Sequence, residues 1–251
     1  MKHIGIGFLV FMLCACQPSP RNFYVDSISG EDSRTGTSPD EAWKSLDKLN
    51  EQNFAPGDTI FFKAGTEYMG QFRPKGSGTK DFPIVIDRFH DGEKPILHGE
   101  GQELYTLLLD GISYWEVNNL EITNRGLEAV PYRSGVWIRA DNTGDRYHIH
   151  LKNLTVHDVN GTEKTGRPAG GGIFWQTRSD SVPTHLVGLL IERCFIFRCC
   201  PGGIAGVDEG EKAVGTDPMI VIRQNQLEQI NGKAIYVAPA GRVRMEGNVI
   251  K

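Results

Sequence analysis

The chain of 251 residues carries 27 lysine and arginine residues against 31 aspartate and glutamate residues, a formal net charge of −4. Nucleic acid is not expected as a partner, because phosphate binding needs a clustered basic surface and the sequence has no basic run. The 30 glycines and the many clusters of isoleucine, valine, leucine and phenylalanine disfavour both a helical bundle and a disordered chain. The length is compatible with one elongated all-β domain or with two smaller domains.

Residues 1–16 read as an export signal that is removed from the mature protein. The apolar run from Ile4 to Leu13 is too short to span a bilayer as a helix. It ends in Leu-Cys-Ala-Cys, which resembles a bacterial lipobox, so Cys16 is expected to be the lipidation site of an exported lipoprotein. An ordinary signal peptide cleaved near Ala15 is the alternative. Residues 17–22 would be an extended tether, and the acyl chains would anchor the protein to a membrane, facing the periplasm or the cell surface.

Residues 23–98 are expected to form an N-terminal cap and the first coils of a repeating fold. A short helix is predicted from Ser38, with Pro39 in its first turn and Leu46 and Leu49 on its apolar side. Such a helix would cover the open end of a strand stack, which otherwise exposes unpaired backbone groups. The strand Thr59–Lys63 follows.

Residues 99–251 contain a recurring segment in which apolar and polar residues alternate, which predicts strands with one buried face. Its equivalent apolar positions are separated by 34, 40, 31 and 23 residues: Val117, Leu151, Ile191, Ile222 and Met245. A second set of strands has the equivalent positions Val136, Ile173, Ile204 and Ile235. Because one repeat cannot bury its own inner face, the copies are expected to stack as coils of a parallel β-helix.

Two further features of these coils are predicted. Asn225 and Asn248 fall at the same corner of successive coils, where asparagine tolerates a left-handed bend and stacked amides can hydrogen-bond. Lys251 follows a strand that ends in mid-coil, so the chain is expected to be the N-terminal part of a longer molecule, with C-terminal coils and some catalytic residues beyond it.

The cysteines and histidines give no sign of a metal site, and no metal is expected. Once the signal is removed, three cysteines remain, an odd number that excludes a full disulfide framework: Cys194, Cys199 and Cys200. At least one is expected to be buried as a free thiol, and a Cys194–Cys199 bridge stays open. His148 and His150 alternate on a predicted strand without zinc-ligand spacing.

The segment from Tyr24 to Leu46, with Pro56-Gly-Asp-Thr-Ile60 and His157-Asp-Val-Asn-Gly161, resembles secreted proteins of the pectate-lyase-like superfamily. The resemblance covers residues 23–251. Within this superfamily, the sequence resembles the carbohydrate-active lipoproteins of Bacteroidetes. It implies an all-β fold, a right-handed parallel β-helix (solenoid) with a short N-terminal capping helix. It also implies a monomer whose partner is a polysaccharide or oligosaccharide.

Inserted loops on one flank of such a solenoid would build a groove for a linear glycan. Glycoside hydrolysis needs a proton-donating carboxylic acid and a second carboxylate. The predicted catalytic pair is Asp158 with Asp208 or Glu209, and His157 would polarise a carboxylate or bind substrate. The alternative is that Asp158 caps a turn while Asp208 and Glu209 are solvated loop acids.

Further loop residues are predicted to bind the substrate, and they are Arg125, Tyr132, Arg133, Glu163 and Arg178. Trp137 and Trp175 would either stack on sugar rings or lie in the core. The favoured function is a glycoside hydrolase that cleaves a plant or algal glycan without a cofactor. The alternatives are a polysaccharide lyase, which would use a base with Ca²⁺ or a basic side chain, and a non-catalytic glycan-binding or structural solenoid.

Overall fold

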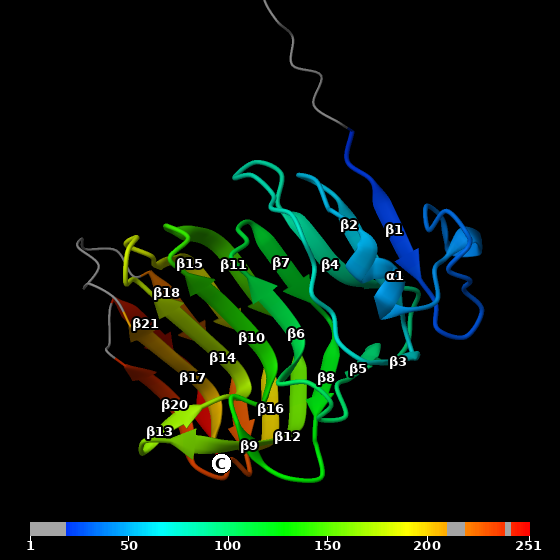
Figure 1. The fold of residues 1–251 in the computed structure, drawn as a ribbon. Coiled ribbons are helices and arrows are strands. Elements are labelled where there is room, and N and C mark those ends of the chain that lie inside the picture. The colour runs from blue at the N-terminus through cyan, green and yellow to red at the C-terminus, as the bar shows by residue number, and fades with distance from the viewer. Residues whose placement is uncertain (1–18, 210–218, 239–241) are drawn as a thin grey trace, which may run out of the picture.

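A computed structural model describes residues 19–209, 219–238 and 242–251, with the exception of the Glu209 side chain. The protein is nearly all-β, and its strands form three sheets that are almost entirely parallel (Figure 1). Within these ranges, no helix is long and apolar enough to cross a membrane. The predicted lipidation site, Cys16, lies outside the described residues.

The three sheets are called A, B and C. Sheet A contains, in spatial order, β1 (Asn22–Val25), β2 (Thr59–Lys63), β4 (Ile84–Phe89), β7 (Trp115–Asn118), β11 (Arg146–Lys152), β15 (Leu186–Glu192), β18 (Ile220–Arg223) and β21 (Val243–Glu246). Sheet B contains β3 (Glu67–Met69), β5 (Ile96–His98), β8 (Glu121–Asn124), β12 (Thr155–Lys164), β16 (Phe195–Cys200), β19 (Gln226–Glu228) and β22 (Val249–Ile250). Sheet C contains β6 (Tyr105–Asp110), β10 (Ser134–Asp141), β14 (Gly171–Arg178), β17 (Gly202–Glu209) and β20 (Lys233–Ala238). The chain visits A, B and C in turn from β7 onward, an arrangement that fits the coils of a parallel β-helix.

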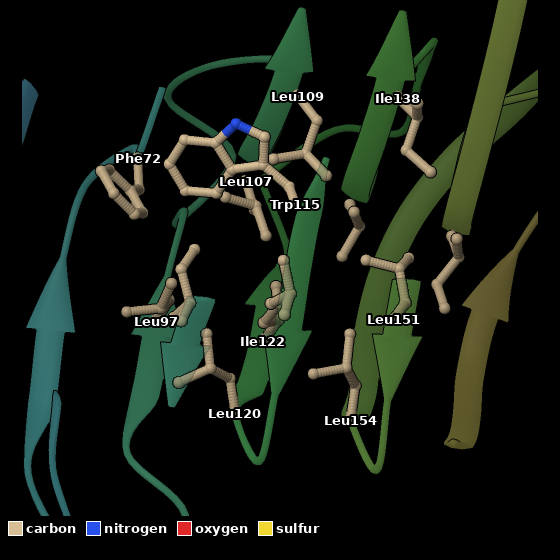
Figure 2. Close-up of a cluster of buried hydrophobic side chains, with 14 of the residues drawn as sticks. Phe72, Leu97, Leu107, Leu109, Trp115, Leu120, Ile122, Ile138, Leu151 and Leu154 are labelled. Atoms are coloured by element: carbon tan, nitrogen blue, oxygen red, sulfur yellow. The ribbon is translucent and has the colours of Figure 1, made fainter. Parts of the chain in front are cut away.

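The predicted register of the coils is confirmed. Leu151 pairs with both Val117 and Ile191, and the row continues through Ile222 to Met245. In sheet C, the row predicted from Val136 to Ile235 is also formed. The inward side chains of the three sheets meet in one continuous core, part of which Figure 2 shows.

The corner between sheets A and B confirms the predicted asparagine stacking but moves the bend by one residue. The Asn225 amide donates to Asn248 Oδ1 over 2.9 Å and to the Ile191 carbonyl over 3.0 Å, and its own Oδ1 accepts the Cys194 N–H. The left-handed residues are the preceding ones, Gln224 and Gly247, with φ of 56° and 62°. Asparagine occupies the next position because its amide satisfies backbone groups inside the corner.

The predicted helix from Ser38 is shorter and starts later than expected. Residues Pro39–Glu41 form a single 3₁₀ turn (η1), and the α-helix α1 comprises only Leu46–Glu51, capped by the Ser45 hydroxyl, which accepts the Lys48 N–H. The break arises because Trp43 pairs with Val25 of β1 and stacks its ring on Phe23 at 5.2 Å. Leu46 and Leu49 of α1 join the core.

The cysteines in the described part of the chain form no disulfide. Cys194 and Cys199 are buried free thiols, so the bridge left open by the sequence is absent. Burial raises the pKa of both thiols to about 12, which keeps them protonated and unreactive.

Candidate functional site

The outer face of sheet C carries a row of buried apolar side chains, which is unusual for a face turned away from the core. Along β10, Val136 and Ile138 point into the core, whereas Trp137 points outward. The register places Trp137 between Leu108 of β6 and Phe174 of β14, and Ala205 of β17 continues the row. These four buried side chains are flanked by partly buried Tyr105, Tyr132, Val207 and Tyr236.

Two short inserted strands pair with the end of β12 beside this apolar row. The end of β12 pairs with β13 (Arg167–Ala169) and with β9 (Val130–Pro131). Tyr132 follows β9, and its ring lies parallel to Trp137 with centroids 5.8 Å apart. Arg133, the next residue, is buried and donates to Asn160 Oδ1 over 3.0 Å and to the Gly101 carbonyl over 3.1 Å. The Arg133 guanidinium therefore holds the inserted segments together and does not line the pockets described below, and its predicted role in substrate binding stays a prediction.

Two pockets of about 230 and 270 Å³ lie over sheet C and share Tyr132 and Gln176. Together they are called the aromatic groove, lined by Tyr132, Trp137, Arg139, Ala140, Asp141, Lys164, Thr165, Arg167, Pro168, Ala169, Phe174, Gln176, Arg178 and Val207. Trp137 Nε1 is buried without a hydrogen-bond partner. An apolar floor with a few polar groups is the usual composition of a ligand site.

Several charged residues that line the groove have partners beside it. Arg139 donates to both carboxylate oxygens of Asp110 over 2.9 and 2.7 Å, and Arg73 donates to the same carboxylate. Although burial opposes it, these contacts hold the pKa of Asp110 below its usual value. Arg178 pairs with Asp180. Lys164 lies 5.0 Å from the Tyr132 ring centre.

Of the predicted substrate-binding residues, two line the groove. Tyr132 contributes to both pockets and Arg178 to one. Arg125 and Glu163 are exposed in the inserted segments but line neither pocket. Trp175, left open by the sequence, lies in the core, whereas Trp137 belongs to the groove.

The predicted catalytic residues Asp158 and His157 lie on sheet B instead. Arg198 Nε donates to Asp158 Oδ1 over 2.8 Å, and His157 lies between Asp158 Oδ2 at 2.7 Å and Glu121 Oε1 at 2.8 Å. The hydrogen bond from Arg198, with that from His157, holds the pKa of Asp158 far below its usual value. Asp158 is thus ionised and cannot donate a proton to a leaving group near neutral pH.

The structure does not bring Asp158 and Asp208 together. Val207 faces the groove, so Asp208, the next residue along β17, faces the opposite side, where the Thr177 hydroxyl donates to it over 2.5 Å. β17 starts at Gly202, and a rise of about 3.3 Å per residue places Asp208 about 20 Å along the strand from the corner with sheet B. The predicted pairing of these two carboxylates is therefore wrong. Glu209 ends β17, and its side chain is not described.

Two features of the site were missed by sequence reasoning. Asp141 and Arg139 line the groove from alternate positions of β10, a signal that was present in the alternation of that strand. On sheet A, Glu116, His148 and His150 gather their ligand atoms within 4.8 Å of one another. Burial, with the neighbouring His148, lowers the pKa of His150 to about 4, so its imidazole is neutral at physiological pH.

The chain resembles glycan-cleaving proteins. No family model matches it. It is 29% identical to a lacto-N-biosidase from Bifidobacterium longum over 62% of this chain and 13% of that protein. It is 35% identical to the Alpha-1,3-galactosidase A of Akkermansia muciniphila over 31% of this chain and 13% of that protein. The crystal structure of the GH136 lacto-N-biosidase from Eubacterium ramulus superposes with a TM-score of 0.73 and 27% identity, covering 86% of this chain and 43% of that one. The chain therefore spans less than half the length of these relatives.

Proposed function

We propose that this protein is a glycoside hydrolase that holds a glycan along the aromatic groove of a right-handed parallel β-helix. The observation that carries the proposal is the outward-facing row of apolar and aromatic side chains on sheet C, bordered by charged pairs. Aromatic rings with polar groups at their edge suit a sugar, which has apolar faces and a hydroxyl rim. The similarity to two lacto-N-biosidases and an α-1,3-galactosidase supports the same class.

The carboxylates of the reaction are proposed to be Asp141 and Glu209. The strand register places Asp141 opposite Arg178, and Arg178 opposite Glu209, in one row across β10, β14 and β17. Neighbouring strands are about 4.8 Å apart, so the two acidic positions are separated by about 10 Å of backbone. Carboxyl groups of glycosidases lie about 5 to 10 Å apart, a span that this row allows. One would protonate the leaving oxygen while the other acts as nucleophile or base.

The test is hydrolysis of an oligosaccharide panel containing lacto-N-biosides, α-1,3-galactosides and plant and algal glycans. Asp141→Asn and Glu209→Gln should each lower kcat by about 10²- to 10⁴-fold with little change in KM. Asp158→Asn should keep the activity, because Asp158 lies on sheet B. Loss of activity in Asp158→Asn alone would overturn the assignment. An unsaturated, ultraviolet-absorbing product would identify a lyase, and binding without turnover a glycan-binding protein.

We further propose that the mature protein is a membrane-anchored lipoprotein acylated at Cys16. The support is the apolar run that ends in Leu-Cys-Ala-Cys, followed by a short polar tether. An anchored hydrolase of this kind would act on glycans outside the cytoplasm.

A further inference from the structure

We propose that Glu116, His148 and His150 bind a zinc ion on the outer face of sheet A, a site separate from the aromatic groove. Glu116 lies on β7, and both histidines lie on β11, the strand of the next coil. Glu116 and His150 are register partners, with their neighbours Trp115, Val117, Ile149 and Leu151 buried in the core. Alternation along the strands therefore turns Glu116 and His150 to the outside.

A local distortion brings the second histidine beside the first. His148 has a left-handed backbone, with φ of 52°, and the ladder between β11 and β15 skips both His148 and Gly188, which has φ of 78°. The rings of His148 and His150 are only 3.7 Å apart between centroids. His148 Nε2 lies 2.9 Å and His150 Nδ1 3.8 Å from Glu116 Oε1. Ligands about 2.0–2.2 Å from a tetrahedral zinc are a little over 3 Å apart, so small rotamer shifts suffice.

The types of ligand atom at this site indicate which metal ion it would bind. Two imidazole nitrogens and one carboxylate oxygen suit zinc, whereas Ca²⁺ and Mg²⁺ prefer oxygen ligands alone. All three side chains are partly exposed, which gives the ion access and leaves a coordination position for water. Lys152 Nζ donates to the other Glu116 oxygen, Oε2, over 2.6 Å. This ion pair occupies Oε2 and leaves Oε1 to the metal.

The zinc would link two successive coils, since Glu116 precedes His148 by 32 residues. An ion that binds only the folded stack stabilises it in proportion to its occupancy. Its place on sheet A, away from sheet C, gives it no part in the proposed hydrolysis. If no zinc binds at this site, the proposed hydrolase function is unaffected.

The test is calorimetric titration of the EDTA-treated protein with ZnCl₂, together with thermal melting. One zinc should bind per chain, and a hundredfold excess over Kd should raise Tm on the order of 5 °C, with no such rise from CaCl₂. His150→Ala should weaken zinc binding at least tenfold, whereas the control His98→Ala, on sheet B, should not change it. Lys152→Gln should bind zinc several-fold more tightly, because a positive charge beside the ion is removed.

A second measurement serves if His150→Ala does not fold. Co²⁺ added to the unaltered protein should give the visible absorption of a four-coordinate site with nitrogen and oxygen ligands, and Zn²⁺ should displace it. Absence of stoichiometric zinc binding, or equal binding in the His150→Ala and unaltered proteins, would overturn the proposal. A cobalt spectrum dominated by thiolate absorption would also overturn it, because it would place the ion on cysteine.

Discussion

Asp158 of β12 and Arg198 of β16 face each other across adjacent coils, and both have left-handed backbones, with φ of 51° and 49°. The ladder between their strands steps past these two residues, pairing His157 with Phe197 and Val159 with Cys199. The shared step turns both side chains to the surface, where they form a double hydrogen bond. Asp158, predicted from the sequence as a catalytic carboxylate, thus forms an ion pair with Arg198 that links two successive coils.

Asp158→Asn should lower the stability of the fold in a pH-dependent way. The pKa of Asp158 is depressed in the folded state, so its contribution is complete above about pH 4, the usual pKa of an unfolded aspartate, and is lost as the pH falls toward the folded pKa. At pH 7 the variant should be less stable by about 1 kcal/mol, and the difference should shrink below pH 4. Urea unfolding at several pH values measures this. A difference that stays constant down to pH 2, or an equal effect of Asp91→Asn at an exposed loop position, would contradict it.

Ile222→Asp should prevent cooperative folding or cost several kcal/mol. Ile222 is fully buried between Ile191 and Met245 in the sheet A row, so an aspartate would place an unpaired charge in the core. Val221→Asp is the matched control, because Val221 is only partly buried on the opposite face of the same strand. Thermal melting compares the two. Equal melting temperatures would reject the register.

Tyr132→Ala should weaken glycan binding about tenfold without a comparable loss of stability. The Tyr132 ring stacks beside Trp137 and lines both pockets of the aromatic groove, and one aromatic contact is worth about 1 kcal/mol. Tyr147→Ala is the control, since Tyr147 is exposed on sheet A. Each substitution is made in a catalytically inactive variant, and titration with the best substrate of the panel measures the loss of binding for Tyr132→Ala and for Tyr147→Ala. Equal losses in the two variants would place the glycan elsewhere.

Cys16→Ser should release the protein from membranes or leave its precursor uncleaved. Cys16 is the proposed acylated residue, and two acyl chains hold a protein far more firmly than one. Cys14→Ser is the control, because the first cysteine of the pair would be removed with the signal. Membrane fractionation and labelling with a palmitate analogue report the outcome. Normal processing and unchanged fractionation of Cys16→Ser would show an ordinary signal peptide.

The stack could be predicted from the sequence because its information is local and repeated. Each coil restates the alternation of apolar and polar residues, so Leu151, Ile191 and Ile222 align without knowledge of the loops between them. The break before α1 was missed because Trp43 is held by Val25, a contact across 18 residues that helical spacing does not encode.

The site was harder to predict because its geometry depends on positions along different strands. Asp158 and Asp208 are both acids in inserted segments, but one ends on sheet B and the other on the inner side of sheet C. The zinc ligands were missed for a related reason. His148 and His150 have no metal spacing of their own, and Glu116 joins them only when the previous coil is laid alongside.

The two-residue corner between sheets A and B, repeated from β7 onward, restricts where these coils can accept change. Asn119, Asn153, Arg193 and Gln224 all take the left-handed backbone there, so the coils from β7 onward cross this edge without a loop. Among these coils, the connections that vary in length lie at the two edges that border sheet C. The borders of the groove can therefore be lengthened or exchanged while the strand register stays fixed, as antibody loops vary on a constant framework. A library that diversifies residues 142–145 and 179–185 would sample new glycan specificities without redesigning the scaffold.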